Sequence, residues 1–194
     1  MKKMILAAGA LLLSLGMFAQ NPSFYVKAGV GMSKWVGEDV EKDYSKFLTG
    51  YSAVVGFEQP LTEAFVFGAE LGAQTRGVKT EVLKENVKYL VHDMTISPFL
   101  GYHFATGSMD IEPHVGLVAS YDLVGKIISG DSSVKLDFKE RDDWKRLGVA
   151  VNPGVTCWFG QFGLDLTWQR GILSLDEDLK IFDNQLLVRV AYRF

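Results

Sequence analysis

The last ten residues of the chain show the period-two pattern of a β-strand. Between Gln185 and Phe194, one face carries Leu186, Val188, Val190, Tyr192 and Phe194. Successive side chains of a strand point to opposite faces, so these five groups form a continuous apolar stripe. Such a stripe has to be covered either by a protein core or by lipid.

Similar segments recur along the chain. The alternation predicts strands at 24–33, 49–58, 64–75, 89–104, 109–121, 144–158, 161–171 and 185–194. Tight turns are expected at 59–63, 105–108 and 159–160, and long, charged loops at 34–48, 76–88, 122–143 and 172–184. Short turns at one end and long loops at the other are typical of a transmembrane barrel with both termini in the periplasm.

The two faces of these strands differ in chemistry. The outward face of the first strand carries Phe24, Val26, Ala28, Val30 and Met32. The inward positions are small or polar and include Lys27, Gly29, Gly31, Ser52, Gly56, Glu58, Gly68, Glu70 and Gly72. Charged groups are costly in lipid but can line a hydrogen-bonded lumen. The sequence therefore predicts an all-β fold, an eight-stranded antiparallel up-and-down transmembrane β-barrel.

The N-terminal residues have the order of a secretory signal peptide. Lys2 and Lys3 precede an apolar stretch over 4–15, and small residues follow up to Ala19. The apolar stretch is shorter than the roughly 18 to 20 residues of a spanning helix. We therefore expect residues 1–19 to be cleaved, which leaves 20–194 as a single outer-membrane barrel domain.

Aromatic residues gather at the predicted strand ends. On the turn side they are Phe24, Phe57, Phe65, Tyr102, Phe104, Phe162, Tyr192 and Phe194, and on the loop side Tyr51, Tyr121, Trp144 and Trp168. Amphipathic rings at both ends of a spanning element are typical of membrane interfaces.

Pro98, Pro113 and Pro153 fall inside predicted strands, where a missing N–H donor predicts bulges or distorted pairing.

The chain resembles the outer-membrane β-barrel domain family of Gram-negative bacteria, in particular the small eight-stranded group with OmpX-like and PorT-like proteins. The matching segments are Met17-Phe18-Ala19-Gln20, Ile96-Ser97-Pro98-Phe99-Leu100, Trp168-Gln169-Arg170-Gly171-Ile172-Leu173 and Val190-Ala191-Tyr192-Arg193-Phe194. The resemblance implies insertion by the barrel-assembly machinery, which reads a C-terminal strand of this kind, here through Val190, Tyr192 and Phe194. It implies no reaction.

The predicted lumen contains both acids and bases. The candidates are Lys27, Glu58, Glu70, Asp93, Asp110, Glu112, His114, Arg146, Asn152, Asp165, Arg189 and Arg193. Unpaired buried charges are costly, and an eight-stranded barrel is only wide enough for side chains to fill it. We therefore expect a plugged lumen in which Asp165 pairs with Arg189, Arg193 or both, in preference to a proton or ion path.

The sequence offers little support for catalysis, for a metal or cofactor site, or for nucleic-acid binding. His92 could act in catalysis with Ser33 or Ser174, but it points outward if Asp93 points inward, so we expect no enzyme. The single Cys157 excludes an intrachain disulfide and a thiol cluster, and we expect neither metal nor cofactor. The formal net charge of −3 comes with no basic run, which argues against a nucleic-acid partner.

These features predict a barrel of the outer membrane with a structural or surface-interaction role. The expected partners are outer-membrane lipid and lipopolysaccharide, and an envelope protein bound through loop 122–143, which could extend as a β-ribbon. One alternative is a PorT-like accessory factor of a secretion or surface-assembly system. Another is a secreted lipocalin-like carrier, which would need an apolar cavity and a polar exterior.

Overall fold

The computed structural model describes residues 22–41, 45–82, 85–130, 132–136, 138, 144–176 and 178–194. The predicted signal peptide, 1–19, lies outside these residues. No helix in the described part of the chain is long and apolar enough to cross a membrane.

The described residues form β-strands joined by turns and loops. The strands are β1 (Ser23–Gly37), β2 (Leu48–Pro60), β3 (Phe65–Val82), β4 (Glu85–Tyr102), β5 (Phe104–Thr106), β6 (Met109–Ser129), β7 (Ser132–Leu136), β8 (Leu147–Val151), β9 (Gly154–Phe159), β10 (Phe162–Gly171) and β11 (Ile181–Arg193). All their pairings are antiparallel.

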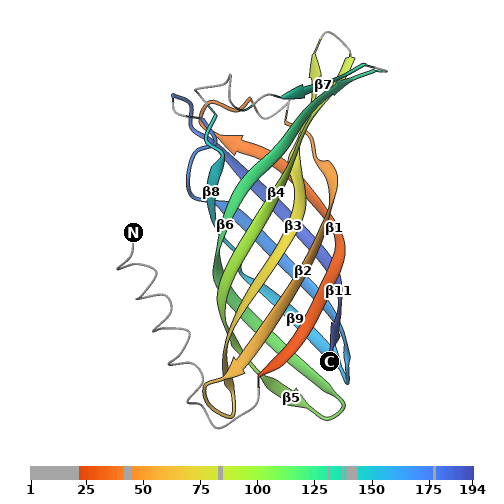
Figure 1. The fold of residues 1–194 in the computed structure, drawn as a ribbon, viewed down its shortest axis with the longest axis vertical. Helices are drawn as coiled ribbons and strands as arrows, with labels where there is room; N and C mark the ends of the chain where they lie inside the picture. The colour runs from red at the N-terminus through yellow and green to blue at the C-terminus, as the bar shows by residue number, and fades with distance from the viewer. Residues whose placement is uncertain are drawn as a thin grey trace.

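The strand pairings close into a ring of 8 strands within the described chain. Residue Val30 of β1 lies opposite Val188 of β11 on one side and opposite Tyr51 of β2 on the other, so β1 joins the two ends of the sheet. Strands β8 and β9 share one position, between β6 and β10 (Figure 1). The predicted up-and-down barrel is confirmed.

One predicted strand, 144–158, consists of two pieces. Strand β8 ends at Val151 and β9 begins at Gly154, because Pro153 between them has no N–H to donate. Pairing with β6 resumes in the same register, since Leu117 faces Val151 and His114 faces Gly154.

Of the two outcomes predicted for the prolines, distorted pairing is found and bulges are not. The β4–β6 ladder is interrupted at Ser97 and Pro98, and the strand is interrupted between β8 and β9 at Pro153. Registry continues past Pro98, Pro113 and Pro153, and the shift in the β4–β6 ladder lies between His92 and Asp93. A proline leaves one carbonyl of the neighbouring strand without its donor, and that loss is tolerated here without an inserted residue.

Two of the predicted loops are largely strand. Residues 76–82 and 85–88 form the outer ends of β3 and β4, with Lys79 opposite Lys88. In segment 122–143, β6 runs on to Ser129 and pairs with β7, as the expected ribbon. Figure 1 shows these strand ends projecting beyond the barrel near β7. We call this end of the molecule the loop end, and the opposite end, near β5, the turn end.

The two faces of the barrel wall have the predicted chemistry. Apolar side chains such as Val30 and Leu164 are exposed on the outside, whereas Tyr25, Phe99 and Trp158 are buried in the lumen. Glycine makes room for these rings. A Cβ on Gly56 would lie 2.5 Å from the Tyr25 ring, and one on Gly68 would lie 2.3 Å from Phe99. An apolar exterior around a charged interior is the reverse of a lipocalin-like carrier.

Candidate functional site

Four charged side chains form a layer across the middle of the lumen. Lys27 Nζ of β1 lies 2.9 Å from Glu70 Oε1 of β3 and 3.2 Å from Asp165 Oδ2 of β10. Arg189 Nε of β11 lies 2.7 Å from Asp165 Oδ1, and its Nη1 lies 3.3 Å from Glu70 Oε2. Two cations and two carboxylates therefore balance each other. The predicted pair is thus Asp165 with Arg189.

Neutral groups complete this middle layer. The hydroxyls of Thr156 and Thr167 donate to Asp165, at 2.9 and 3.1 Å. The His114 ring lies beside Thr167, with its Nε2 3.4 Å from Oγ1. Each threonine adds a donor to a buried carboxylate, which offsets part of its lost hydration.

A second layer lies nearer the loop end and is centred on Arg76 of β3. Its Nε lies 2.6 Å from Asp93 Oδ2, and its Nη2 lies 2.6 Å from Asp122 Oδ1. The side chain is 4% exposed. Sequence reasoning placed Asp93 in the lumen but left Arg76 and Asp122 in predicted loops, because charges on both faces of these segments obscure the alternation.

A third group lies at the turn end of the lumen. Arg193 Nη2 lies 3.3 Å from Glu58 Oε2 and 3.6 Å from Glu112 Oε2, and its guanidinium stacks over Trp158 at 4.0 Å. His103, between β4 and β5, is the remaining member of this group. Arg193 is therefore paired with these two glutamates and forms no ion pair with Asp165.

Three further lumen candidates are Asn152, Asp110 and Arg146. Asn152 donates to Ser97 Oγ at 2.8 Å inside the lumen, and Asp110 lies beside His103 at the turn end. Arg146 departs from the prediction. It lies before β8, donates to the backbone carbonyl of Asp122 and covers the ring of Tyr121, so it belongs to the loop-end rim.

A pocket of about 350 Å³ opens at the loop end. Three aromatic rings form part of its wall. The ring centroid of Trp35 lies 5.5 Å from that of Tyr89 and 5.8 Å from that of Trp144. The acidic residues Asp39, Glu41 and Asp176 also line it. Sequence reasoning missed this pocket, because its residues come from four different segments.

Trp144 was predicted to belong to the lipid-facing girdle, and that prediction is wrong. Its ring stacks with Phe138 and donates from Nε1 to Asp122 Oδ2 at 2.9 Å, so it covers the barrel mouth. The structure places the other predicted girdle rings at the strand ends, with Phe65 against Tyr102, Tyr102 against Phe104 and Phe162 against Tyr192. Phe24, Phe57 and Trp168 also lie on the outer face.

The C-terminal strand presents its apolar stripe to the outside. Val190 and Phe194 are exposed, and Tyr192 packs between Phe162 and Phe194. The backbone N–H of Phe194 donates to Phe24 at 2.9 Å, so the chain end is paired with β1. The assembly signal proposed for Val190, Tyr192 and Phe194 stays a prediction.

The candidate catalytic groups do not converge. His92 Nδ1 lies 2.9 Å from Thr75 Oγ1, whereas Asp93 points to Arg76 on the opposite face. Ser33 exchanges hydrogen bonds with the backbone of Gly77, and Ser174 donates to Leu179 and Ile181. Within the described residues, neither serine is hydrogen-bonded to a histidine.

A closed barrel with a lipid-facing apolar exterior and a charged, filled interior defines an integral outer-membrane protein. The sequence pattern of the family described as "Outer membrane protein beta-barrel domain" matches residues 18–177. The chain belongs to this family, and the protein resides in the outer membrane of a Gram-negative bacterium. No curated protein matches the sequence.

The chain is also similar to solved structures of low sequence identity. Neisserial surface protein A is 17% identical, with a TM-score of 0.55 over 90% of this chain and 100% of its own. Ail, the attachment invasion locus protein of Yersinia pestis, is 12% identical, with a TM-score of 0.49 and the same coverage. The outer membrane enzyme PagL is 13% identical, with a TM-score of 0.49 over 86% of this chain and 97% of its own. At 17% identity, the similarity to Neisserial surface protein A shows a shared fold alone.

Proposed function

We propose that this protein is a non-conducting, non-enzymatic barrel with a surface-interaction role exerted at its loop end. The observation that carries the proposal is the filled lumen. Charged layers centred on Arg76, on Lys27 with Arg189, and on Arg193 cross it at three heights. With the interior occupied by its own side chains, the surfaces left for a partner are the two ends and the lipid face.

The loop-end pocket is the surface best suited to a partner. Its aromatic rings expose π-faces that attract cations, and its carboxylates carry negative charge. Both features favour a positively charged group, such as an ammonium or guanidinium on a molecule at the cell surface. A volume of about 350 Å³ suits one such group.

Lipid and assembly contacts belong to the same proposal. The apolar exterior binds outer-membrane lipid, and lipopolysaccharide surrounds the loop end. The barrel-assembly machinery recognises the stripe of Val190, Tyr192 and Phe194 during insertion.

A second candidate is an accessory role in a secretion or surface-assembly system. It is favoured by β7, which is exposed except at Leu136 and which pairs, among the described strands, with β6 alone. A strand edge of this kind can add a strand from an envelope protein.

The pocket proposal is tested by titrating the refolded protein with a lysine-containing tripeptide, and with the matching glutamine tripeptide as the neutral control. We expect saturable binding of the lysine peptide, weakened roughly tenfold by Trp35→Leu, since a desolvated cation–π contact is worth about 1 to 2 kcal/mol. Trp168→Leu, on the lipid face, should leave binding unchanged. Equal binding of both peptides, or equal effects of the two substitutions, would contradict the proposal.

A further inference from the structure

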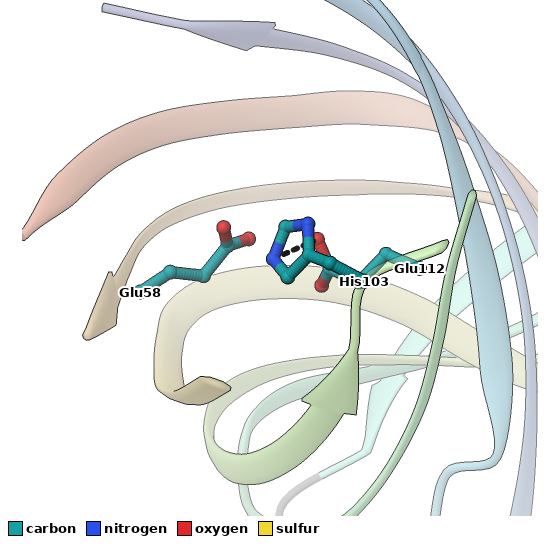
Figure 2. A group of neighbouring side chains, drawn as sticks. All are labelled: Glu58, His103 and Glu112. Atoms are coloured by element: carbon teal, nitrogen blue, oxygen red, sulfur yellow. Dashed lines mark ion pairs between the residues drawn. The ribbon is translucent and has the colours of Figure 1, made fainter. Parts of the chain in front are cut away.

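Three potential metal ligands converge at the turn end of the lumen. They are Glu58 near the end of β2, His103 between β4 and β5, and Glu112 on β6, and their ligand atoms lie within 4.8 Å of one another. Figure 2 shows the three side chains reaching from separate parts of the barrel wall toward a common point. Both glutamates are buried, at 2% and 0% exposure.

One oxygen of each glutamate lacks a hydrogen-bond partner. Glu112 Oε2 accepts from Trp158 Nε1 at 3.0 Å, and Glu58 Oε2 lies 3.3 Å from Arg193 Nη2. By contrast, Oε1 of both Glu58 and Glu112 is buried without any hydrogen-bond partner in the described structure. Buried carboxylate oxygens are almost always bound to a donor or an ion, so these two oxygens are available to a ligand.

The histidine is held in the orientation that a metal ligand requires. His103 Nδ1 lies 2.7 Å from Asp110 Oδ2, and Nε2 lies 3.5 Å from Glu112 Oε2. In the neutral tautomer that donates from Nδ1 to this carboxylate, the lone pair of Nε2 is directed toward the glutamates. This carboxylate–histidine arrangement is the usual support of a metal-bound imidazole.

We propose that Glu58, His103 and Glu112 bind a divalent transition metal of the zinc type, with Asp110 as a positioning residue. One imidazole nitrogen with two carboxylates is a three-ligand set that leaves a position open for water. Mixed nitrogen and oxygen ligands favour zinc, copper or nickel over magnesium and calcium, which take oxygen ligands. His103 and Arg193 keep 19% and 22% of their side-chain surface exposed, so the ion has access from the periplasmic side.

Arg193 is the competitor for this site. Its guanidinium already balances part of the charge of Glu58 and Glu112, and a bound metal has to displace it along Trp158 toward solvent. Replacing Arg193 with Gln removes the competing cation and keeps a polar side chain. We therefore expect Arg193→Gln to bind the metal several-fold more tightly than the wild type.

The test uses the full barrel without a histidine tag, refolded in micelles and freed of metal by a chelator. Calorimetric titration with zinc chloride should show one equivalent bound per chain, and magnesium chloride should show none. His103→Gln should weaken binding by at least about tenfold, and Asp110→Asn by about 10- to 100-fold, with recovery in Asp110→Glu. His92→Gln, at the loop end, is the matched histidine control and should bind as the wild type does.

Cobalt absorption gives a second readout that a folding defect does not imitate. The wild type and His92→Gln should develop visible cobalt bands, whereas a folded His103→Gln barrel should not. Absence of saturable binding in the wild type, or identical zinc affinity in His103→Gln, would overturn the proposal and show that the free oxygens hold a proton or water instead. Neither result bears on the proposal for the loop-end pocket, since the two sites lie at opposite ends of the barrel.

Discussion

Arg189→Leu is expected to destabilise the barrel by about 3 to 5 kcal/mol, because it leaves buried carboxylates with too little positive charge. Arg189 contacts Asp165 at 2.7 Å and Glu70 at 3.3 Å, and its side chain is 2% exposed. In its absence Lys27 alone faces both acids. Urea titration in lipid vesicles, followed by tryptophan fluorescence, measures the free energy of unfolding.

Two further variants separate lost charge pairing from lost packing. Lys180→Leu breaks an ion pair with Glu38 at the exposed loop end and should cost a small fraction of the Arg189 effect. Adding Glu70→Gln to Arg189→Leu should recover part of the loss, since it removes one stranded carboxylate. Equal effects of Arg189→Leu and Lys180→Leu would show that the middle layer contributes no more than a surface pair.

Val188→Arg should destabilise the barrel by roughly 2 to 4 kcal/mol, because it places a charge on the lipid face near mid-bilayer. Val188 is exposed on the outer face and lies between Val30 of β1 and Leu166 of β10 in the sheet. The same urea titration measures the effect.

Val134→Arg on β7 is the matched control for this prediction. Val134 is more exposed, but it lies on the ribbon beyond the barrel, where the new charge meets water. Its change in unfolding free energy should be small. If Val188→Arg were as harmless as Val134→Arg, the lipid and lumen faces would be assigned wrongly.

The alternation of side chains was sufficient to predict the barrel and part of its interior. It placed Lys27, Glu70, Asp165 and Arg189 on inward positions, and the structure brings them together in one layer. The two-residue period of polarity is informative here because lipid outside and a narrow lumen inside impose opposite chemistry on successive residues.

The same reasoning failed where strands leave the membrane. Past Arg76 and Asp122, both faces of the strands meet water or other loops, so the segments that begin at these two residues were interpreted as loops. Trp144 was assigned to the girdle from its place in the sequence alone, whereas its partners Trp35 and Phe138 come from other segments. Contacts across loops carry no periodic signal.

The turn-end cluster was missed for a related reason. Glu58 and Glu112 were predicted to face the lumen, whereas His103 lies at the end of the predicted strand 89–104 and was not assigned to the lumen. Their convergence depends on the curvature and closure of the wall, which bring β2, β6 and the β4–β5 junction together. Strand periodicity gives the face of each residue but not its neighbour across a lumen.

The central claim is that the barrel is sealed by its own side chains, so that its function lies at its surface. Planar-bilayer recording of the purified protein tests it most directly. With layers of ion pairs across the lumen, we expect no large, stable opening at any applied voltage that the bilayer tolerates. Reproducible porin-sized openings from the pure protein would contradict the sealed lumen. They would indicate that the protein functions in transport.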